Sequence, residues 1–273
     1  MAENVETSFD SERVRARINT SQPHTARIWN YWLGGKDNYD SDRTVGDQIR
    51  QIHPGIGEYA RADRQFLGRA VEHLVRERGV RQFLDIGTGL PTADNTHEVA
   101  QRIAPESRIV YVDNDPTVLV HARALLDSTP EGRTDYLDAD LRDVDTILEH
   151  AAKTLDLTQP VALVLLGVVI FIEDDDEALG LVRRLMHRLP AGSYLVLSHT
   201  ITSPDMPDVD AAVAFWNEHG TPRLTQRTPE HVARFFEGTA LLPPGVVSCS
   251  RWLPGSATGD ADVAMFGGVG HKA

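Results

Sequence analysis

The chain has 273 residues, with 27 Lys and Arg against 40 Asp and Glu, so its formal net charge at pH 7 is -13. Hydrophobic residues make up 41% and charged residues 25%, a balance typical of globular proteins. The negative charge repels phosphate backbones and therefore disfavours a broad nucleic-acid interface.

The N-terminal quarter of the chain predicts a tail and then helices. Residues 1–20 are polar and charged without periodicity, which indicates a flexible tail and not a secretion signal. Large apolar side chains crowd into residues 28–33, and apolar residues recur with helical spacing over Arg61–Arg78. We therefore expect residues 21–79 to form a helical extension placed before a sheet.

From residue 80 onward, strand and helix patterns alternate. Five apolar segments predict strands at 82–87, 108–115, 134–141, 161–172 and 193–200. Helical patterns separate them at 96–103, 116–126, 144–152 and 177–189. The segment 161–172 is so uniformly apolar that it fits one central strand covered on both faces. Such alternation is typical of an α/β fold with a doubly wound, mostly parallel sheet.

The last quarter of the chain is less regular. Short helices are expected at 210–219 and 229–236, the second with Thr228 as its N-cap. Two closing strands are expected at 245–252 and 261–271, joined by a turn that contains Gly and Ser. We expect residues 80–273 to form one domain.

A glycine-rich turn, Asp85-Ile86-Gly87-Thr88-Gly89, follows the first strand. Glycines there let a ligand approach the backbone, and amides at a helix start favour an anionic group. An ordinary tight turn is the alternative. The dinucleotide fingerprint requires a glycine three positions after Gly89, where Thr92 stands, and Pro91 changes the turn. A nicotinamide or flavin site is thereby disfavoured but not excluded.

Acidic residues follow the next two strands. Asp113 and Asn114 end the second strand, where a carboxylate can accept both hydroxyls of a ribose. Asp140 and Leu141 end the third strand, where a carboxylate and a backbone amide can contact an adenine ring. Each group alone could be an ordinary turn. Three such groups at consecutive strand ends indicate a ligand site, because open α/β sheets bind ligands at that edge.

These residues resemble the class I S-adenosylmethionine (SAM)-dependent methyltransferases. Residues 85–89 look like their first motif, Asp113 like their ribose-binding acid, Asp140 like their adenine-side acid and residues 161–172 like their fourth motif. More narrowly, HTARIWNYWLGGKDNYDSDR, DIGTGLPTADNTHEVAQ and LVLSH look like an actinobacterial SAM methyltransferase family of unassigned substrate. The resemblance implies a Rossmann-like, seven-stranded sheet that closes with an antiparallel C-terminal hairpin.

The resemblance also implies SAM as the cofactor and a set of residues that bind it. Those at the strand ends are Asp85, Gly87, Thr88, Gly89, Asp113, Asn114, Asp140, Leu141, Leu166 and Gly167. The N-terminal extension, acting as a lid, would add Tyr31, Lys36, Asn38 and Tyr39, with Lys36 paired to the cofactor's carboxylate. The alternative is that Trp29 and Trp32 only pack this helix against the rest of the protein.

The sequence gives no clear catalytic base. The fourth motif lacks the Asn-Pro-Pro-Tyr pattern of amino-group methylases, and Ile170 stands where similar proteins often carry histidine. His199, at the end of the fifth strand, is the nearest replacement; a histidine that caps the strand end is the alternative. Residues 22–60 and 203–227 are expected to shape the acceptor pocket.

Methyl transfer from SAM to an oxygen or nitrogen atom of a small molecule is therefore the expected function. A non-catalytic SAM-binding sensor or partner module stays open, as does, less favourably, an NAD(P)-dependent oxidoreductase. The single cysteine, Cys249, excludes an internal disulfide and a thiolate zinc site, and we expect no metal. The longest apolar run is too short to span a bilayer as a helix. We expect a cytoplasmic protein that binds neither membranes nor nucleic acids, and a homo-oligomer stays open.

Overall fold

The computed structural model describes residues 18–118, 121, 128–253 and 261–273. The tail expected over residues 1–20, the helix expected at 116–126 and the turn before the last strand therefore lie wholly or largely outside the described residues. The described strands are β1 (Gln82–Ile86), β2 (Arg108–Asp113), β3 (Arg133–Asp138), β4 (Ala162–Leu166), β5 (Tyr194–Thr200), β6 (Ala240–Leu241), β7 (Val247–Ser248) and β8 (Met265–His271). They form one sheet in the order β3-β2-β1-β4-β5-β8-β6, with β7 also paired to β8.

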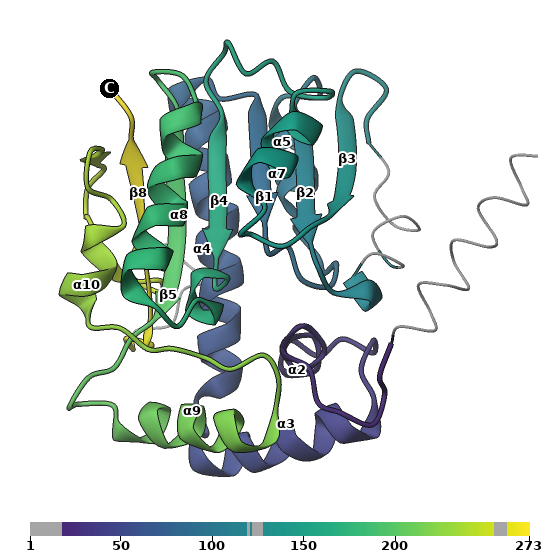
Figure 1. Cartoon of the computed structure of the whole chain (residues 1–273), viewed down its shortest axis with the longest axis vertical. Helices are drawn as coiled ribbons and strands as arrows, with labels where there is room; N and C mark the ends of the chain where they lie inside the picture. Colours follow the sequence, from purple (N-terminus) through teal and green to yellow (C-terminus); the bar gives the residue numbers. More distant parts are fainter. Residues whose placement is uncertain (1–17, 119–120, 122–127, 254–260) are drawn as a thin grey trace, which may run out of the picture.

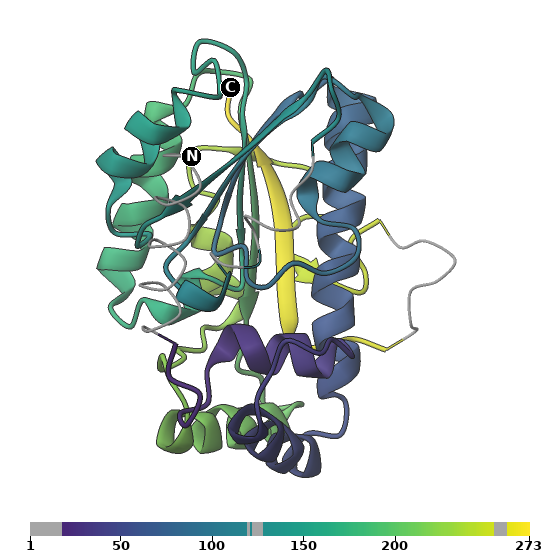
Figure 2. The same cartoon turned by 90° about the vertical axis from the view of Figure 1, so that its right-hand side faces the viewer.

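Helices cover both faces of this sheet (Figures 1 and 2). The described helices are α2 (Thr25–Trp32), α3 (Asp40–Ile52), α4 (Ile56–Arg78), α5 (Thr96–Ile103), α7 (Val144–Ala151), α8 (Asp175–Arg188), α9 (Pro207–His219) and α10 (Pro229–Arg234). Figure 2 shows α4 and α5 on one face, and α7 and α8 on the other. No helix in the described part of the chain is both long and apolar enough to cross a membrane.

The first five strands are parallel, and β8 pairs antiparallel with β5. This confirms the doubly wound sheet with antiparallel closing strands. The edge next to β8 is divided between two short strands, because Ala240 pairs with His271 and Val247 pairs with Gly267. The prolines at 243 and 244 lie between β6 and β7, and proline has no N–H to donate to a strand partner. Of the strand expected at 245–252, only β7 forms.

The single strand expected over residues 161–172 is wrong in its second half. The strand β4 ends at Leu166, because Gly167 adopts a left-handed φ of 56°. A short 3-10 helix, η1 (Val169–Phe171), follows it. Val169 and Ile170 are buried there, so the long apolar run reflects burial on both sides of a turn and not extended backbone.

The helices that precede the sheet extend beneath the carboxyl ends of its parallel strands. In Figure 1, α2, α3 and α9 lie below these strand ends, and α4 continues upward along the sheet. The helix expected from Arg61 begins earlier, at Ile56. The sequence did not predict α3, whose buried face is limited to a few residues such as Val45 and Ile49.

Candidate functional site

A cavity of about 230 Å³ lies at the carboxyl edge of the parallel strands. Its lining includes all ten residues predicted at the strand ends: Asp85, Gly87, Thr88, Gly89, Asp113, Asn114, Asp140, Leu141, Leu166 and Gly167. On the opposite side, α2 contributes Thr25, Ala26, Trp29 and Asn30, and α4 contributes Asp63, Arg64 and Leu67. The sheet edge and the N-terminal helices therefore enclose one site.

The glycine-rich turn after β1 leaves room for a ligand. Gly87 has φ 79°, and a Cβ there would lie 2.4 Å from the Val168 Cβ. Gly89 has φ 67°, and its N–H donates to Asp113 Oδ2 at 2.8 Å, while a Cβ there would meet no atom within 4 Å. The turn thus binds the acid of the next strand and presents open space to the cavity.

Two backbone amides hold Asp113 in place. Besides the Gly89 amide, the Asp115 amide donates to Asp113 Oδ1 at 2.9 Å. Burial raises the pKa of Asp113 to about 6, against the opposing effect of these two hydrogen bonds. Asp115 itself is buried, and its Oδ2 lies 2.8 Å from Nδ1 of His24, just before α2. This contact brings the N-terminal extension to the end of β2.

The residues after β3 form a more exposed polar group. Asn114 Nδ2 donates to Asp140 Oδ2 at 3.1 Å, and the Arg142 amide donates to Asp140 Oδ1 at 2.9 Å. Arg142 Nε in turn donates to Glu177 Oε1 at 2.7 Å. Leu141 is buried beside them. Asp113, at the end of β2, and Asp140, after β3, are therefore both held in place by hydrogen bonds along one wall of the cavity.

Arg64 is a cavity residue that the sequence analysis missed. Its Nη2 makes only long hydrogen bonds, at 3.3–3.4 Å to the carbonyls of Ala93 and Asp94 and to Asn95 Oδ1. Its Nε is a buried donor with no hydrogen-bond partner among the described residues. An incompletely satisfied guanidinium in the wall of a cavity suits an anionic ligand group such as a carboxylate. The open glycine turn and this buried donor both fit a SAM-type ligand.

The profile of the S-adenosyl methyltransferase family matches residues 11–273. The chain belongs to this family. Two crystal structures are similar over nearly the whole chain. A DUF574 family protein from Streptomyces avermitilis MA-4680 is 46% identical, covering 94% of this chain and 100% of that one, with a TM-score of 0.91. A protein from Thermobifida fusca YX assigned to the methyltransferases is 36% identical, covering 93% and 96%, with a TM-score of 0.84.

More distant structures share only the fold of this methyltransferase. Magnesium protoporphyrin IX methyltransferase from Synechocystis PCC 6803, solved with bound S-adenosylhomocysteine (SAH), is 12% identical, covering 90% of this chain and 93% of that one, with a TM-score of 0.55. No curated protein matches the sequence. The family assignment makes the chain a SAM-dependent methyltransferase, and SAM is its cofactor.

Asp63 is a second cavity residue of the methyltransferase that the sequence analysis missed. Its carboxylate is buried, and Cys249 Sγ donates to its Oδ1 at 3.9 Å. Burial raises the pKa of Asp63 to about 6, which a hydrogen bond from Ser198 and the charge of Arg64 oppose. The Ser198 hydroxyl also accepts from the Gly167 amide at 3.1 Å. One hydroxyl therefore links Asp63 to the glycine after β4.

Replacing Asp63 with asparagine is expected to stabilise the ligand-free methyltransferase at pH 8. The pKa is about 6 in the folded state against 3.8 for an unperturbed aspartate, so the folded state binds the proton more tightly. Stability is then greatest below pH 4, falls as the pH rises to 6 and is constant above it. Asp63→Asn would remove a cost of up to about 3 kcal/mol above pH 6 and little near pH 4.

Thermal denaturation at pH 4 and pH 8 measures this difference. Glu58→Gln, on the exposed side of the same helix, is the control and should shift the melting temperature little at either pH. An equal change for Asp63→Asn at both pH values would contradict the prediction.

Of the four residues predicted as a lid, Tyr31 lies in α2 and the other three lie in the loop after it. None of them lines the cavity, as far as the described residues define it. The Tyr31 hydroxyl donates to Asp47 Oδ1 at 2.7 Å, and Asn38 Nδ2 donates to Asn30 Oδ1 at 3.0 Å. The guanidinium carbon of Arg27 lies 5.3 Å from the centre of the Tyr39 ring, and Lys36 is exposed. The extension therefore reaches the cavity through α2 itself, while the loop after it holds that helix in place.

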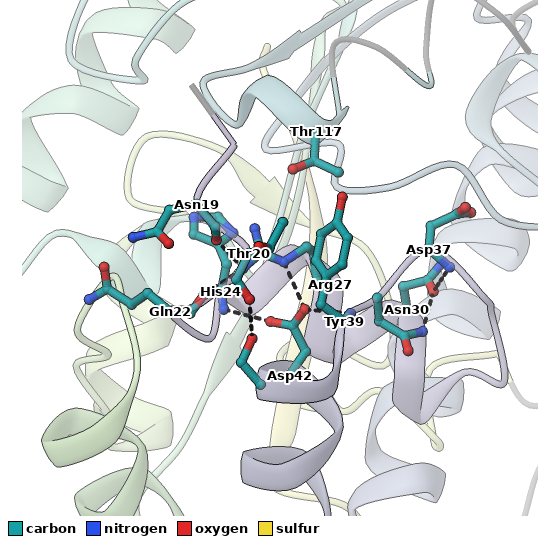
Figure 3. A network of polar contacts seen from close by, with 12 residues as sticks. Asn19, Thr20, Gln22, His24, Arg27, Asn30, Asp37, Tyr39, Asp42 and Thr117 are labelled. Atoms are coloured by element: carbon teal, nitrogen blue, oxygen red, sulfur yellow. Dashed lines mark hydrogen bonds and ion pairs between the residues drawn. The ribbon is translucent and has the colours of Figure 1, made fainter. Parts of the chain in front are cut away.

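A buried ion pair fixes α2 on α3. Arg27 Nε donates to Asp42 Oδ2 at 2.8 Å, and these two side chains are 4% and 0% exposed. Asp42 also accepts from the backbone amides of His24 at 3.0 Å and Tyr39 at 2.9 Å (Figure 3). Arg27 Nη2 donates to the Gln22 carbonyl at 2.5 Å. Both the start of α2 and the loop after it are thereby tied to one carboxylate.

The structure does not bring His199 to the cavity. The ring is fully buried, with Nδ1 donating to the Thr200 carbonyl at 2.7 Å and Nε2 accepting from Arg227 Nη1 at 2.8 Å. Burial lowers its pKa to about 3, so the imidazole is neutral. It stacks on Phe235 at 5.9 Å. These contacts match the alternative of a histidine that caps the end of the strand.

Proposed function

We propose that this methyltransferase transfers the methyl group of SAM to an oxygen or nitrogen atom of a small molecule. The supporting observation is enclosure, because strand ends line one side of the cavity and α2 lines the other. The Arg27–Asp42 pair keeps α2 there. A concave site with walls on both sides favours a compact acceptor over a macromolecular chain.

Five residues of the cavity would hold the cofactor. In the proposed arrangement, Asp113 accepts from the ribose hydroxyls, Asp140 and the Leu141 amide contact the adenine, and Arg64 pairs with the carboxylate. Gly89 gives the methionine part access to the backbone. When bound, SAM supplies a methyl group that its sulfonium makes electrophilic. The protein then has to orient the acceptor and to remove its proton.

We propose Asp63 as the group that takes the proton from the acceptor. Its carboxylate lines the cavity and is linked through Ser198 to Gly167, which lies at the end of β4. A pKa of about 6 leaves it ionised at pH 7 and more basic than an ordinary aspartate. His199, with both ring nitrogens engaged inside the protein, is less suited to that task.

Calorimetric titration with SAH tests the cofactor arrangement. Asp113→Ala is expected to weaken binding about tenfold or more, because hydrogen bonds to a charged group contribute about 1.5–3 kcal/mol each. Asp138→Ala is the matched control, since Asp138 is the register partner of Asp113 on β3 but does not line the cavity within the described residues. An Asp113→Ala protein that binds SAH normally would overturn the ribose assignment.

The acceptor class is tested by SAH release from SAM in the presence of small phenols, carboxylic acids and amines, followed by mass spectrometry. Turnover with one of these classes is the expected result. Release of SAH with protein or nucleic acid substrates, but with no small molecule, would contradict the proposal.

A further inference from the structure

A second cavity, of about 50 Å³, lies next to the cofactor cavity. Two residues of α2, Thr25 and Trp29, line both. Other parts of its wall come from α3, α4, η1 and α9. In Figure 1, α3 and α9 lie below the sheet. The lining residues on these elements include Ile49, Tyr59, Ile170, Val209, Ala212 and Trp216.

Most polar side chains of this second cavity have partners within the protein. The Tyr59 hydroxyl bonds to Thr200 Oγ1, and Trp216 Nε1 donates to the Pro222 carbonyl at 2.7 Å. His53 Nδ1 lies 2.5 Å from Asp208 Oδ2, a contact that joins the end of α3 to α9. The rest of the wall is almost wholly apolar. A charged group buried against it would lose its hydration without compensation.

Two structural elements run from one cavity into the other. On α4, Tyr59 lines the second cavity and Asp63, about one turn further, lines the cofactor cavity. In the segment after β4, Ile170 lines the second cavity, whereas Val168 and Phe171 line the first. A molecule seated in the second cavity and extending past Trp29 would therefore place its other end near Asp63.

We propose that the second cavity binds an uncharged, short branched alkyl group of the methyl acceptor, with the atom to be methylated on the cofactor side of Trp29. The inference rests on the proposed function. Size supports it, because an apolar cavity of about 150 Å³ holds a benzene ring. A cavity of about 50 Å³ therefore suits an alkyl branch better than a second ring.

Binding of three phenols to the SAH-saturated protein tests the proposal. The probes are phenol, 4-isopropylphenol and 4-hydroxybenzoate, and their dissociation constants are measured by ligand-detected NMR. 4-Isopropylphenol is expected to bind at least about tenfold more tightly than phenol, because each buried methylene contributes about fourfold. 4-Hydroxybenzoate is expected to bind no better than phenol, since its carboxylate would enter an apolar cavity.

Two alanines of α9 supply a variant and its matched control. Ala212 is buried in the wall of the second cavity, whereas Ala211 is exposed. Ala212→Trp is expected to reduce 4-isopropylphenol binding to the level of phenol, and Ala211→Trp is expected to leave it unchanged. Ala212→Leu fills less volume and serves if the tryptophan variant does not fold. Affinity for SAH should stay within about twofold in each, since neither alanine lines the cofactor cavity.

The same titrations separate the two proposals. If the wild-type protein fails to bind SAH, the proposed function fails. If it binds SAH but binds no phenol saturably, binds phenol and 4-isopropylphenol equally, or prefers 4-hydroxybenzoate, the alkyl site alone is overturned. The alkyl site is also overturned if Ala211→Trp and a folded Ala212 variant change the affinity for 4-isopropylphenol equally.

Discussion

Asp42→Ala is expected to lower the free energy of unfolding by about 3–5 kcal/mol, because it leaves the Arg27 guanidinium buried without its partner. In a chain of this length, that loss corresponds to a fall in melting temperature of about 10 °C. The variant also removes the acceptor of the His24 and Tyr39 amides, so residues on both sides of α2 lose an anchor. We therefore expect weaker SAH binding as well, since α2 lines the cavity.

Asp40→Ala provides the matched control for this prediction. Asp40 is the first residue of α3, the helix that also contains Asp42. It pairs with Arg43, but its side chain is 97% exposed. Its removal should leave both the melting temperature and SAH affinity unchanged, because water replaces the lost partner. Thermal denaturation and calorimetry decide the matter. If Asp40→Ala and Asp42→Ala behave alike, the buried pair does not anchor α2.

Arg64→Met is expected to weaken SAH binding about 100-fold. The basis is the pairing proposed between this guanidinium and the carboxylate of the cofactor, since hydrogen bonds between charged groups contribute about 1.5–3 kcal/mol each. 5′-Methylthioadenosine keeps the nucleoside but has no carboxylate. Its affinity should therefore be unaffected by Arg64→Met. Calorimetric titrations of the wild type and of Arg64→Met with SAH and with 5′-methylthioadenosine measure both affinities.

Lys36 is the control for Arg64, because the sequence analysis placed the carboxylate's partner there. Lys36 is exposed in the loop after α2 and does not line the cavity within the described residues. Lys36→Met should bind SAH normally. A large loss for Lys36→Met, or an Arg64→Met effect of equal size on both ligands, would contradict the assignment of Arg64.

The strand-end part of the site could be predicted because it depends on local patterns. Each parallel strand is a short apolar run that ends in polar residues or glycine, and all such ends meet at one edge of the sheet. The positions of Gly87, Asp113 and Asp140 followed from that rule, and the cavity gathers all three. The fold class followed from the same alternation of strands and helices.

The helical wall of the site could not be predicted in the same way. The periodicity of α4 shows which face is apolar, but it does not show that Asp63 and Arg64 meet the sheet edge. The available signal was the occurrence of two charged residues, Asp63 and Arg64, within the apolar pattern of α4. Likewise, the aromatic cluster of residues 28–33 indicated a docked helix, while the choice of Trp29 as a cavity residue depends on how α3 supports α2.

Trp29 belongs to the walls of both cavities, so the two ligands of the proposed reaction would share a surface. Any displacement of this indole by one ligand alters the volume open to the other. Thermodynamic linkage then requires reciprocity: the factor by which SAH changes the affinity for 4-isopropylphenol equals the factor by which the phenol changes the affinity for SAH. Where one ligand displaces the indole, cofactor and acceptor would bind cooperatively or antagonistically, and not independently.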